Sequence, residues 1–277
     1  MIAPMLASAM TDPVTGGAFD ARFASGWALE QKMDGHRVLV DVSGGRVQAY
    51  SRPRAGAQFP HVKSLPPTMV DVLLTLPDGI YDGELCAAGG ISSDVTRKGA
   101  TLVVVLFDRL AASDGTRMIP LTGRGYADRR IALLAALACL PDGQQCVSTV
   151  ESLTPTWARV QAVWARGGEG VILKRLTSVY QAGRRSPDWL KVKAGGVAVG
   201  EIIGFETGAL GPYSVTVVRL ASGLRTTVKT LDNATIADIT ANPDRYLGAR
   251  LVISHKGVLA SGKYRHPMFD HLAGDGE

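Results

Sequence analysis

Residues 30–50, EQKMDGHRVLVDVSGGRVQAY, contain two β-rich runs on either side of a pair of glycines. The runs are Val38 to Val42 and Arg46 to Tyr50, with Ser43-Gly44-Gly45 between them. A glycine turn between two such runs is typical of a β-hairpin. Just before the first run, Lys32 stands two residues ahead of Asp34-Gly35. The stretch therefore predicts a hairpin with a lysine at its entrance.

Outward from this hairpin, short apolar runs alternate with helical patterns. Further strands are predicted at Ile80–Cys86, Leu102–Phe107, Glu169–Lys174 and Trp189–Lys193. The run from Thr101 to Leu106 is almost wholly apolar, which predicts a strand buried on both faces and ending near the aromatic Phe107. Helices are predicted at Arg124–Leu140 and at Trp157–Arg166, the second capped by Thr154-Pro155 and ended by Gly167-Gly168.

The pattern of predicted elements changes after Ala194-Gly195-Gly196, which is the best candidate for a linker and a hinge. Strands are predicted beyond it at Gly200–Phe205, Ser214–Leu220, Arg225–Lys229 and Arg250–His255, with one short helix at about Asn233–Thr240. About five strands with one helix suggest a small barrel of the OB type, and half of a sandwich is the alternative.

Bulk composition sets broad limits on the class of protein. The 277 residues are 46% hydrophobic and 20% charged, which suits a packed core and argues against wholesale disorder. A net charge of +5 fits an anionic partner. The apolar N-terminus lacks the basic region of a signal peptide, and no uncharged apolar run reaches the ~20 residues that span a bilayer. Three cysteines without CxxC spacing predict neither a disulfide framework nor a zinc site, so we expect a cytoplasmic protein.

Several short segments place charged or aromatic side chains at predicted strands. After Lys32-Met33-Asp34-Gly35 they are Tyr81-Asp82-Gly83-Glu84-Leu85, Val105-Leu106-Phe107-Asp108, Glu169-Gly170-Val171-Ile172-Leu173-Lys174 and Trp189-Leu190-Lys191-Val192-Lys193. In isolation each carboxylate is more often a solvated strand end, and Phe107 alone is more often core. Lys191 and Lys193 share one face of a strand because they lie two residues apart.

Taken together and in this order, the segments resemble the covalent nucleotidyltransferases, the superfamily of DNA ligases, RNA ligases and mRNA capping enzymes. Within it the chain most resembles small bacterial ATP-dependent DNA ligases of the end-joining type. Pro4-Met5-Leu6-Ala7, Gly183-Arg184-Arg185-Ser186 and Gly262-Lys263-Tyr264-Arg265-His266-Pro267 carry that closer likeness. The 30 residues before Lys32 leave no room for a DNA-encircling domain, so the resemblance implies a minimal ligase.

The resemblance implies an α+β fold. A nucleotidyltransferase (ATP-grasp-like) domain of antiparallel sheets flanked by helices is expected at residues 1–194, followed by an OB-fold β-barrel at residues 197–277. It also implies that Lys32 attacks the α-phosphate of ATP and forms a lysyl–AMP intermediate. AMP then passes to a 5′-phosphate at a nick, and the 3′-hydroxyl displaces it.

Roles for the other site residues follow from the same resemblance. Glu30 is expected at the adenine amino edge and Phe107 stacked on adenine, while Glu84 contacts the ribose and the metal region. Glu169 is the second metal-associated carboxylate, and Asp34 and His36 are structural or orienting. Nucleotide or phosphate contacts are expected from Arg37, Arg52, Arg185, Lys191 and Lys193.

The implied cofactors are ATP and Mg²⁺ or Mn²⁺, and the implied partner is nicked or broken duplex DNA, bound by a monomer. Two alternatives remain open. One is an RNA ligase or a capping-type guanylyltransferase. Comparing the transfer of label onto the protein from ATP with that from GTP would discriminate this alternative. The other is a degenerate relative that only binds nucleic acid, for which basic charge and an OB-like domain suffice.

The C-terminal residues depart from the pattern of the resembled family. Met268, His271 and Ala273 occupy places where basic residues that orient pyrophosphate are expected. We therefore predict that the protein is purified partly adenylylated and turns over slowly with free ATP. An intact-mass spectrum should show a fraction carrying one AMP, and absence of the adduct both before and after incubation with ATP would contradict this.

Overall fold

The computed structural model describes residues 2–10, 15–51, 61–90, 92–193, 195–230, 232–255, 257, 263–264 and 266–273. The chain forms two compact units, each with its own core. The first contains Met1–Gln161 and Gly170–Val192, and the second contains Ala162–Glu169 and Lys193–Glu277. None of the helices in these described ranges is long and apolar enough to cross a membrane.

The predicted hairpin forms two neighbouring strands of a seven-stranded sheet in the first unit. The strands are β3 (His36–Ser43), β4 (Arg46–Ser51), β5 (His61–Lys63), β6 (Gly79–Ala87), β7 (Leu102–Ser113), β8 (Met118–Pro120) and β9 (Val147–Thr149), in the order β5-β4-β3-β6-β7-β8 with β9 beside β7. Ser43 pairs with Arg46, so Gly44 and Gly45 form the turn, with φ of 56° and 71°. Two residues with positive φ give the twist that a tight hairpin needs.

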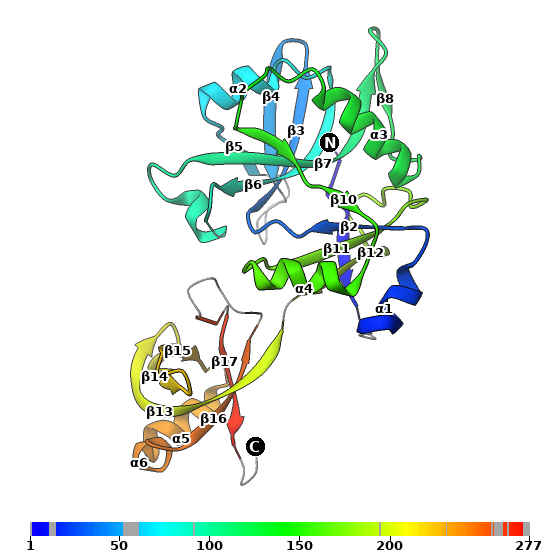
Figure 1. Ribbon diagram of the computed structural model, residues 1–277. Helices are drawn as coiled ribbons and strands as arrows, with labels where there is room; N and C mark the ends of the chain where they lie inside the picture. The colour runs from blue at the N-terminus through cyan, green and yellow to red at the C-terminus, as the bar shows by residue number, and fades with distance from the viewer. Residues whose placement is uncertain are drawn as a thin grey trace. The chain divides into compact units, whose positions relative to one another are not determined.

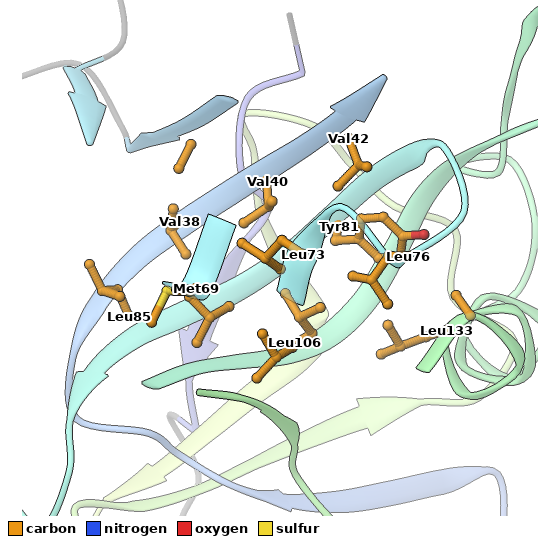
Figure 2. Close-up of a cluster of buried hydrophobic side chains, with 14 of the residues drawn as sticks. Val38, Val40, Val42, Met69, Leu73, Leu76, Tyr81, Leu85, Leu106 and Leu133 are labelled. Atoms are coloured by element: carbon orange, nitrogen blue, oxygen red, sulfur yellow. The ribbon is translucent and has the colours of Figure 1, made fainter. Parts of the chain in front are cut away.

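Two helices cover the outer face of this sheet. They are α2 (Pro67–Leu73) and α3 (Tyr126–Leu137), and a short 3₁₀ turn, η1 (Ser92–Thr96), precedes β7. Alternate β3 side chains, Val38, Val40 and Val42, point to this face and share one buried cluster with Met69 of α2 and Leu133 of α3 (Figure 2). The predicted helix over Arg124–Leu140 is confirmed in place, with tighter ends.

A five-stranded sheet faces the inner side of the first sheet (Figure 1). Its strands are β1 (Leu6–Ala9), β12 (Arg185–Lys193), β11 (Gly170–Arg175), β2 (Trp27–Gln31) and β10 (Ser152–Leu153), in that order. Helices α1 (Gly16–Phe23) and α4 (Trp157–Ala165) accompany it. Alternate side chains on the inner faces of the two sheets, among them Leu39, Phe107 and Trp189, share one buried cluster.

Two local predictions were wrong. The cap of α4 is Thr156 rather than Thr154, because the Thr156 hydroxyl accepts the backbone N–H of Arg159 (3.3 Å). Strand β7 does not end near Phe107 but continues to Ser113. Asp108, the next residue, lies inside the strand, where its carboxylate is fully buried and paired with Arg129.

The second unit contains a closed five-stranded barrel. Its strands are β13 (Gly196–Gly208), β14 (Gly211–Leu220), β15 (Arg225–Lys229), β16 (Arg250–His255) and β17 (Met268–Leu272), in the order β13-β14-β15-β17-β16, with helices α5 (Asn233–Ala241) and α6 (Pro243–Tyr246). Asp232 caps α5 by accepting the backbone N–H of Thr235 (2.8 Å). The predicted strands and helix after the linker are confirmed. Ala194 lies outside the described residues, and Gly196 already belongs to β13.

A buried ion pair fastens α3 to the sheets of the first unit. Arg129 Nε and Nη2 each lie 2.9 Å from a carboxylate oxygen of Asp108 on β7, and both side chains have no exposed surface. Arg129 Nη1 donates to the carbonyl of Ser178 (2.8 Å), in the segment that follows β11. One guanidinium therefore joins a helix, a strand of one sheet and a connection from the other.

Replacing Arg129 by methionine would leave the Asp108 carboxylate buried without its partner. We expect the free energy of unfolding of the first unit to fall by about 3–5 kcal/mol, measured by urea denaturation with tryptophan fluorescence. Arg117→Met is the control, since that side chain is 78% exposed in its pair with Asp114, and it should leave the transition in place. Equal transitions for both variants would contradict the role assigned to Arg129.

Candidate active site

A pocket of about 580 Å³ opens in the first unit where strands of its two sheets converge. Strands β2, β11 and β12 of the five-stranded sheet and β3, β6 and β7 of the seven-stranded sheet contribute to its walls. The residues predicted for the site that line it are Glu30, Lys32, Arg37, Glu84, Phe107, Arg185 and Lys191. Side chains from seven places along the chain therefore meet in one cavity.

Lys32 follows directly after β2 and is half-buried. Its backbone N–H donates to the carbonyl of Gly170 (2.8 Å), which extends the pairing of β2 with β11 by one residue. The backbone of Lys32 is thus fixed although the strand has formally ended. Glu30 and Lys32 lie two residues apart and both line the pocket, as does Gln31 between them.

Gly35 allows the chain to pass close to β6 immediately after Lys32. A Cβ atom at this position would lie 2.3 Å from the carbonyl oxygen of Leu85 and 2.9 Å from Cγ of Glu84. Only a residue without a side chain fits there without displacing the β6 backbone. The close approach to β6 therefore requires glycine at position 35, apart from the part that Asp34-Gly35 plays in the sequence motif.

The inner end of the pocket holds a buried ion pair. Lys174 Nζ lies 2.6 Å from Glu30 Oε2, and each side chain is only 2% exposed. The hydroxyl of Tyr126 donates to the other carboxylate oxygen, Glu30 Oε1. Burial, followed by the nearby charge of Glu30, raises the pKa of the Tyr126 hydroxyl well above its usual range, so the phenol stays protonated and donates. Sequence reasoning assigned no role to Lys174 or Tyr126.

Aromatic rings surround the same ammonium group. Lys174 Nζ lies 4.5 Å from the ring centroid of Phe107, 4.5 Å from that of Tyr126 and 4.4 Å from that of Trp189. Phe107 and Trp189 pack edge to face, with centroids 6.3 Å apart. Both rings also line the pocket, so the ion pair has apolar walls suited to a flat aromatic ligand.

Arg37 reaches the pocket from β3 but is held by a second buried carboxylate. Its Nε and Nη2 lie 2.5 and 2.6 Å from the two oxygens of Asp82, and its guanidinium lies 4.7 Å from the Phe107 ring centroid. Burial opposes the charge, but the Asp82 carboxylate outweighs it and raises the pKa of Arg37 above its usual value. Tyr180 also donates to Asp82 (2.6 Å).

The outer part of the pocket carries further basic side chains. Arg185 begins β12 and donates to the carbonyl of Ala7 (2.5 Å). Lys63 and His36 line the pocket as well, with Lys63 Nζ 3.3 Å from His36 Nδ1. Burial and then the charge of Lys63 lower the pKa of His36, so its ring stays neutral and accepts. Only Glu30 and Glu84 bring carboxylates to the lining that the structure describes.

Three predicted residues are not placed in this pocket. Arg52 lies outside the described residues. Glu169 and Lys193 are assigned to the second unit, where Lys193 Nζ lies 2.5 Å from Glu169 Oε1. Their expected roles stay predictions.

The donor set of the pocket is compatible with a hard divalent cation that takes few protein ligands. Within the part of the chain that the structure describes, no group of three or more Asp, Glu, His or Cys side chains could hold a metal by itself. Glu84 supplies one carboxylate at the pocket wall. Mg²⁺ is often bound through one or two carboxylates together with phosphates and water, which fits this arrangement.

Comparison with known proteins finds one family that matches most of the chain and relatives that match part of it. Residues 4–193 match the family described as ATP dependent DNA ligase domain. A Probable DNA ligase of Anaeromyxobacter sp. (strain Fw109-5) is 34% identical over 186 residues, which is 60% of this chain and 34% of that protein. The Multifunctional non-homologous end joining DNA repair protein LigD of Mycobacterium tuberculosis (strain ATCC 25618 / H37Rv) is 33% identical over 196 residues, 69% of this chain and 24% of that protein. The chain spans about a third or less of the length of these relatives.

Solved structures share the fold over nearly the whole chain. A Lig E DNA ligase, described as binding DNA with a minimal scaffold, superposes with a TM-score of 0.63 at 17% identity, covering 98% of this chain and 100% of that one. A mycobacterial DNA ligase D complexed with ATP and MES superposes with a TM-score of 0.59 at 22% identity, covering 99% and 95%. The mixed, sheet-rich architecture expected from the sequence is thus confirmed.

Gly35→Ala tests the close approach beside Lys32. Because the new methyl group meets backbone rather than a movable side chain, we expect the free energy of unfolding to fall by about 1–3 kcal/mol. Gly17→Ala in α1 is the matched control, since nothing lies within 4 Å of its Cβ position. Chemical denaturation should show an unchanged or raised stability for Gly17→Ala, and the same result for Gly35→Ala would disprove the steric argument.

Proposed function

Because the chain belongs to the ATP-dependent DNA ligase family, we propose that it seals breaks in duplex DNA through a lysyl–AMP intermediate on Lys32. One observation carries the proposal. Lys32 lines the same pocket as the aromatic walls of Phe107 and Trp189 and as the basic residues of the outer part. A nucleoside triphosphate needs all three: a flat apolar slot, cations for its phosphates and a nucleophile between them.

The proposed reaction has three steps. Lys32 Nζ attacks the α-phosphorus of ATP, a P–N bond forms, the α–β phosphoanhydride bond breaks and pyrophosphate leaves. A 5′-phosphate oxygen of DNA then attacks the same phosphorus, which breaks the P–N bond and gives an adenylylated DNA end. The 3′-hydroxyl oxygen then attacks the 5′-phosphate phosphorus of the DNA and loses its proton to solvent. A phosphodiester bond forms, the phosphoanhydride bond to AMP breaks, and AMP leaves with the electron pair.

The pocket's charge distribution supports these steps. Arg185 and Lys191 line the pocket, and we assign them to the phosphates together with Lys32. The positive charge of Arg37 is offset by Asp82, so we assign it to orienting the nucleotide against Phe107.

The remaining roles rest on the family. Glu84 is proposed to contact the ribose and, with Glu169, the divalent cation. Mg²⁺ or Mn²⁺ would neutralise phosphate charge there. Arg52 and Lys193 complete the set as phosphate contacts.

The DNA partner is proposed from the family and from the second unit. We assign the closed barrel to an OB fold and divide the chain into an adenylation domain at residues 1–194 and an OB domain at residues 197–277. Barrels of this type bind nucleic acid through a face of their strands. Because LigD is named an end-joining repair protein, we favour broken or nicked duplex DNA as substrate and DNA repair as the setting.

Lys32→Ala tests the proposal directly. The wild-type protein with ATP and Mg²⁺ should gain one AMP at residue 32, located by peptide mapping, and should seal a nicked duplex. The variant should lose both activities because no other group replaces the amine. Lys98→Ala, at an exposed lysine, should retain both, and an adenylyl group mapped to any other residue would refute the mechanism.

A further inference from the structure

Tyr126 does not line the pocket, yet its hydroxyl contacts a residue that does. It has no exposed surface and stands at the start of α3. Its hydroxyl donates to Glu30 Oε1, while Lys174 occupies Glu30 Oε2. Both carboxylate oxygens therefore have a donor from the protein, and the carboxylate cannot turn without breaking one of these contacts.

The helix that carries Tyr126 is itself fixed to the strand that carries Lys174. The backbone N–H of Ala127 donates to the carbonyl of Leu176 (2.8 Å), just after β11. Two residues further on, Arg129 donates to the carbonyl of Ser178 (2.8 Å). The phenol and the ammonium are thus held at a set separation, with Lys174 Nζ 3.5 Å from the Tyr126 hydroxyl, and both contact Glu30.

Glu30 and Lys174 present an acceptor beside a donor to the pocket. An ionised carboxylate only accepts hydrogen bonds, and an ammonium only donates them. Adenine offers the complementary edge, with the 6-amino group as donor beside N1 as acceptor. Guanine offers the reverse, with O6 against the carboxylate and the N1–H against the ammonium. A polar site of this kind rejects a mismatched partner strongly because buried groups are left unpaired.

We propose that Tyr126 is the positioning residue for nucleotide selectivity: by fixing the Glu30 carboxylate beside Lys174, it sets the edge that accepts adenine and rejects guanine. The inference rests on the proposed function and deepens it. Tyr126 acts through Glu30 and touches no substrate, which distinguishes it from Phe107 and Trp189 in the pocket wall.

The test combines Tyr126→Phe with removal of the group that Glu30 would contact. The variant loses only the hydroxyl and keeps the ring beside Lys174. Purine riboside triphosphate is ATP without its 6-amino group. Protein is first freed of adenylate with pyrophosphate and Mg²⁺, and dissociation constants for both nucleotides are then measured by calorimetry in EDTA. Binding is thereby read separately from adenylyl transfer.

We expect Tyr126→Phe to weaken ATP binding about tenfold or more, the size of one hydrogen bond to a charged group. Purine riboside triphosphate should bind the wild type and the variant equally, because it lacks the amino group that would donate to Glu30. The preference for ATP over GTP should fall by the same factor as ATP binding. Tyr81→Phe is the matched control, because Tyr81 is equally buried and its hydroxyl donates to the Pro77 carbonyl instead. Tyr81→Phe should leave the dissociation constants of both nucleotides unchanged.

A merely structural role gives a different pattern. Equal weakening of ATP and purine riboside triphosphate by Tyr126→Phe would overturn the inference, and so would unchanged ATP binding. Wild-type protein that binds ATP but transfers no AMP to Lys32 would refute the proposed function alone. Wild-type protein that does not bind ATP would refute both.

Discussion

The ion pair between Glu30 and Lys174 is the constraint on which the interior of the first unit depends. Each charge alone would cost several kcal/mol to enclose between two apolar sheets, so neither is tolerable without the other. Glu30 faces Ile172 across the β2–β11 ladder, and Lys174 lies two residues further on the same face. A slip of one residue would turn one partner to the opposite face and leave the other unpaired. The register that joins these charges also places Lys32, two residues after Glu30, in the pocket.

Charge is used in two different ways along this pocket. At the inner end, Lys174 and Arg37 are each neutralised by a buried carboxylate, Glu30 and Asp82. Such groups add little net field and act through the direction of their hydrogen bonds. At the outer end, Lys191 and Lys63 line the pocket, with Glu84 the only carboxylate there among the described lining residues. That excess of positive charge suits phosphates, whereas the neutralised end suits an uncharged base.

Sequence reasoning succeeded where the cause of a structure is local. The Gly44-Gly45 turn defines its own hairpin, and the barrel strands follow from alternation within a few residues. It failed where a partner is remote. Tyr126 lies 96 positions from Glu30, so no neighbouring residue marks its contact with the carboxylate. The same holds for Asp108 inside β7, because its partner Arg129 lies 21 positions further along the chain. Strand β17 was missed because its side chains are half-buried or exposed and show no apolar alternation.

An ion pair also has an advantage over neutral side chains for reading a purine edge. An asparagine or glutamine amide presents one donor and one acceptor, but a half-turn of the amide exchanges them at little cost. A site built from amides could therefore adapt to guanine by rotation. A carboxylate and an ammonium cannot exchange roles, since one lacks protons and the other lacks lone pairs. The Glu30–Lys174 pair accordingly fixes the hydrogen-bonding pattern by composition, and Tyr126 needs only to fix its geometry. In the proposed nucleotide site, these fixed donor and acceptor roles are the physical origin of the preference for adenine over guanine.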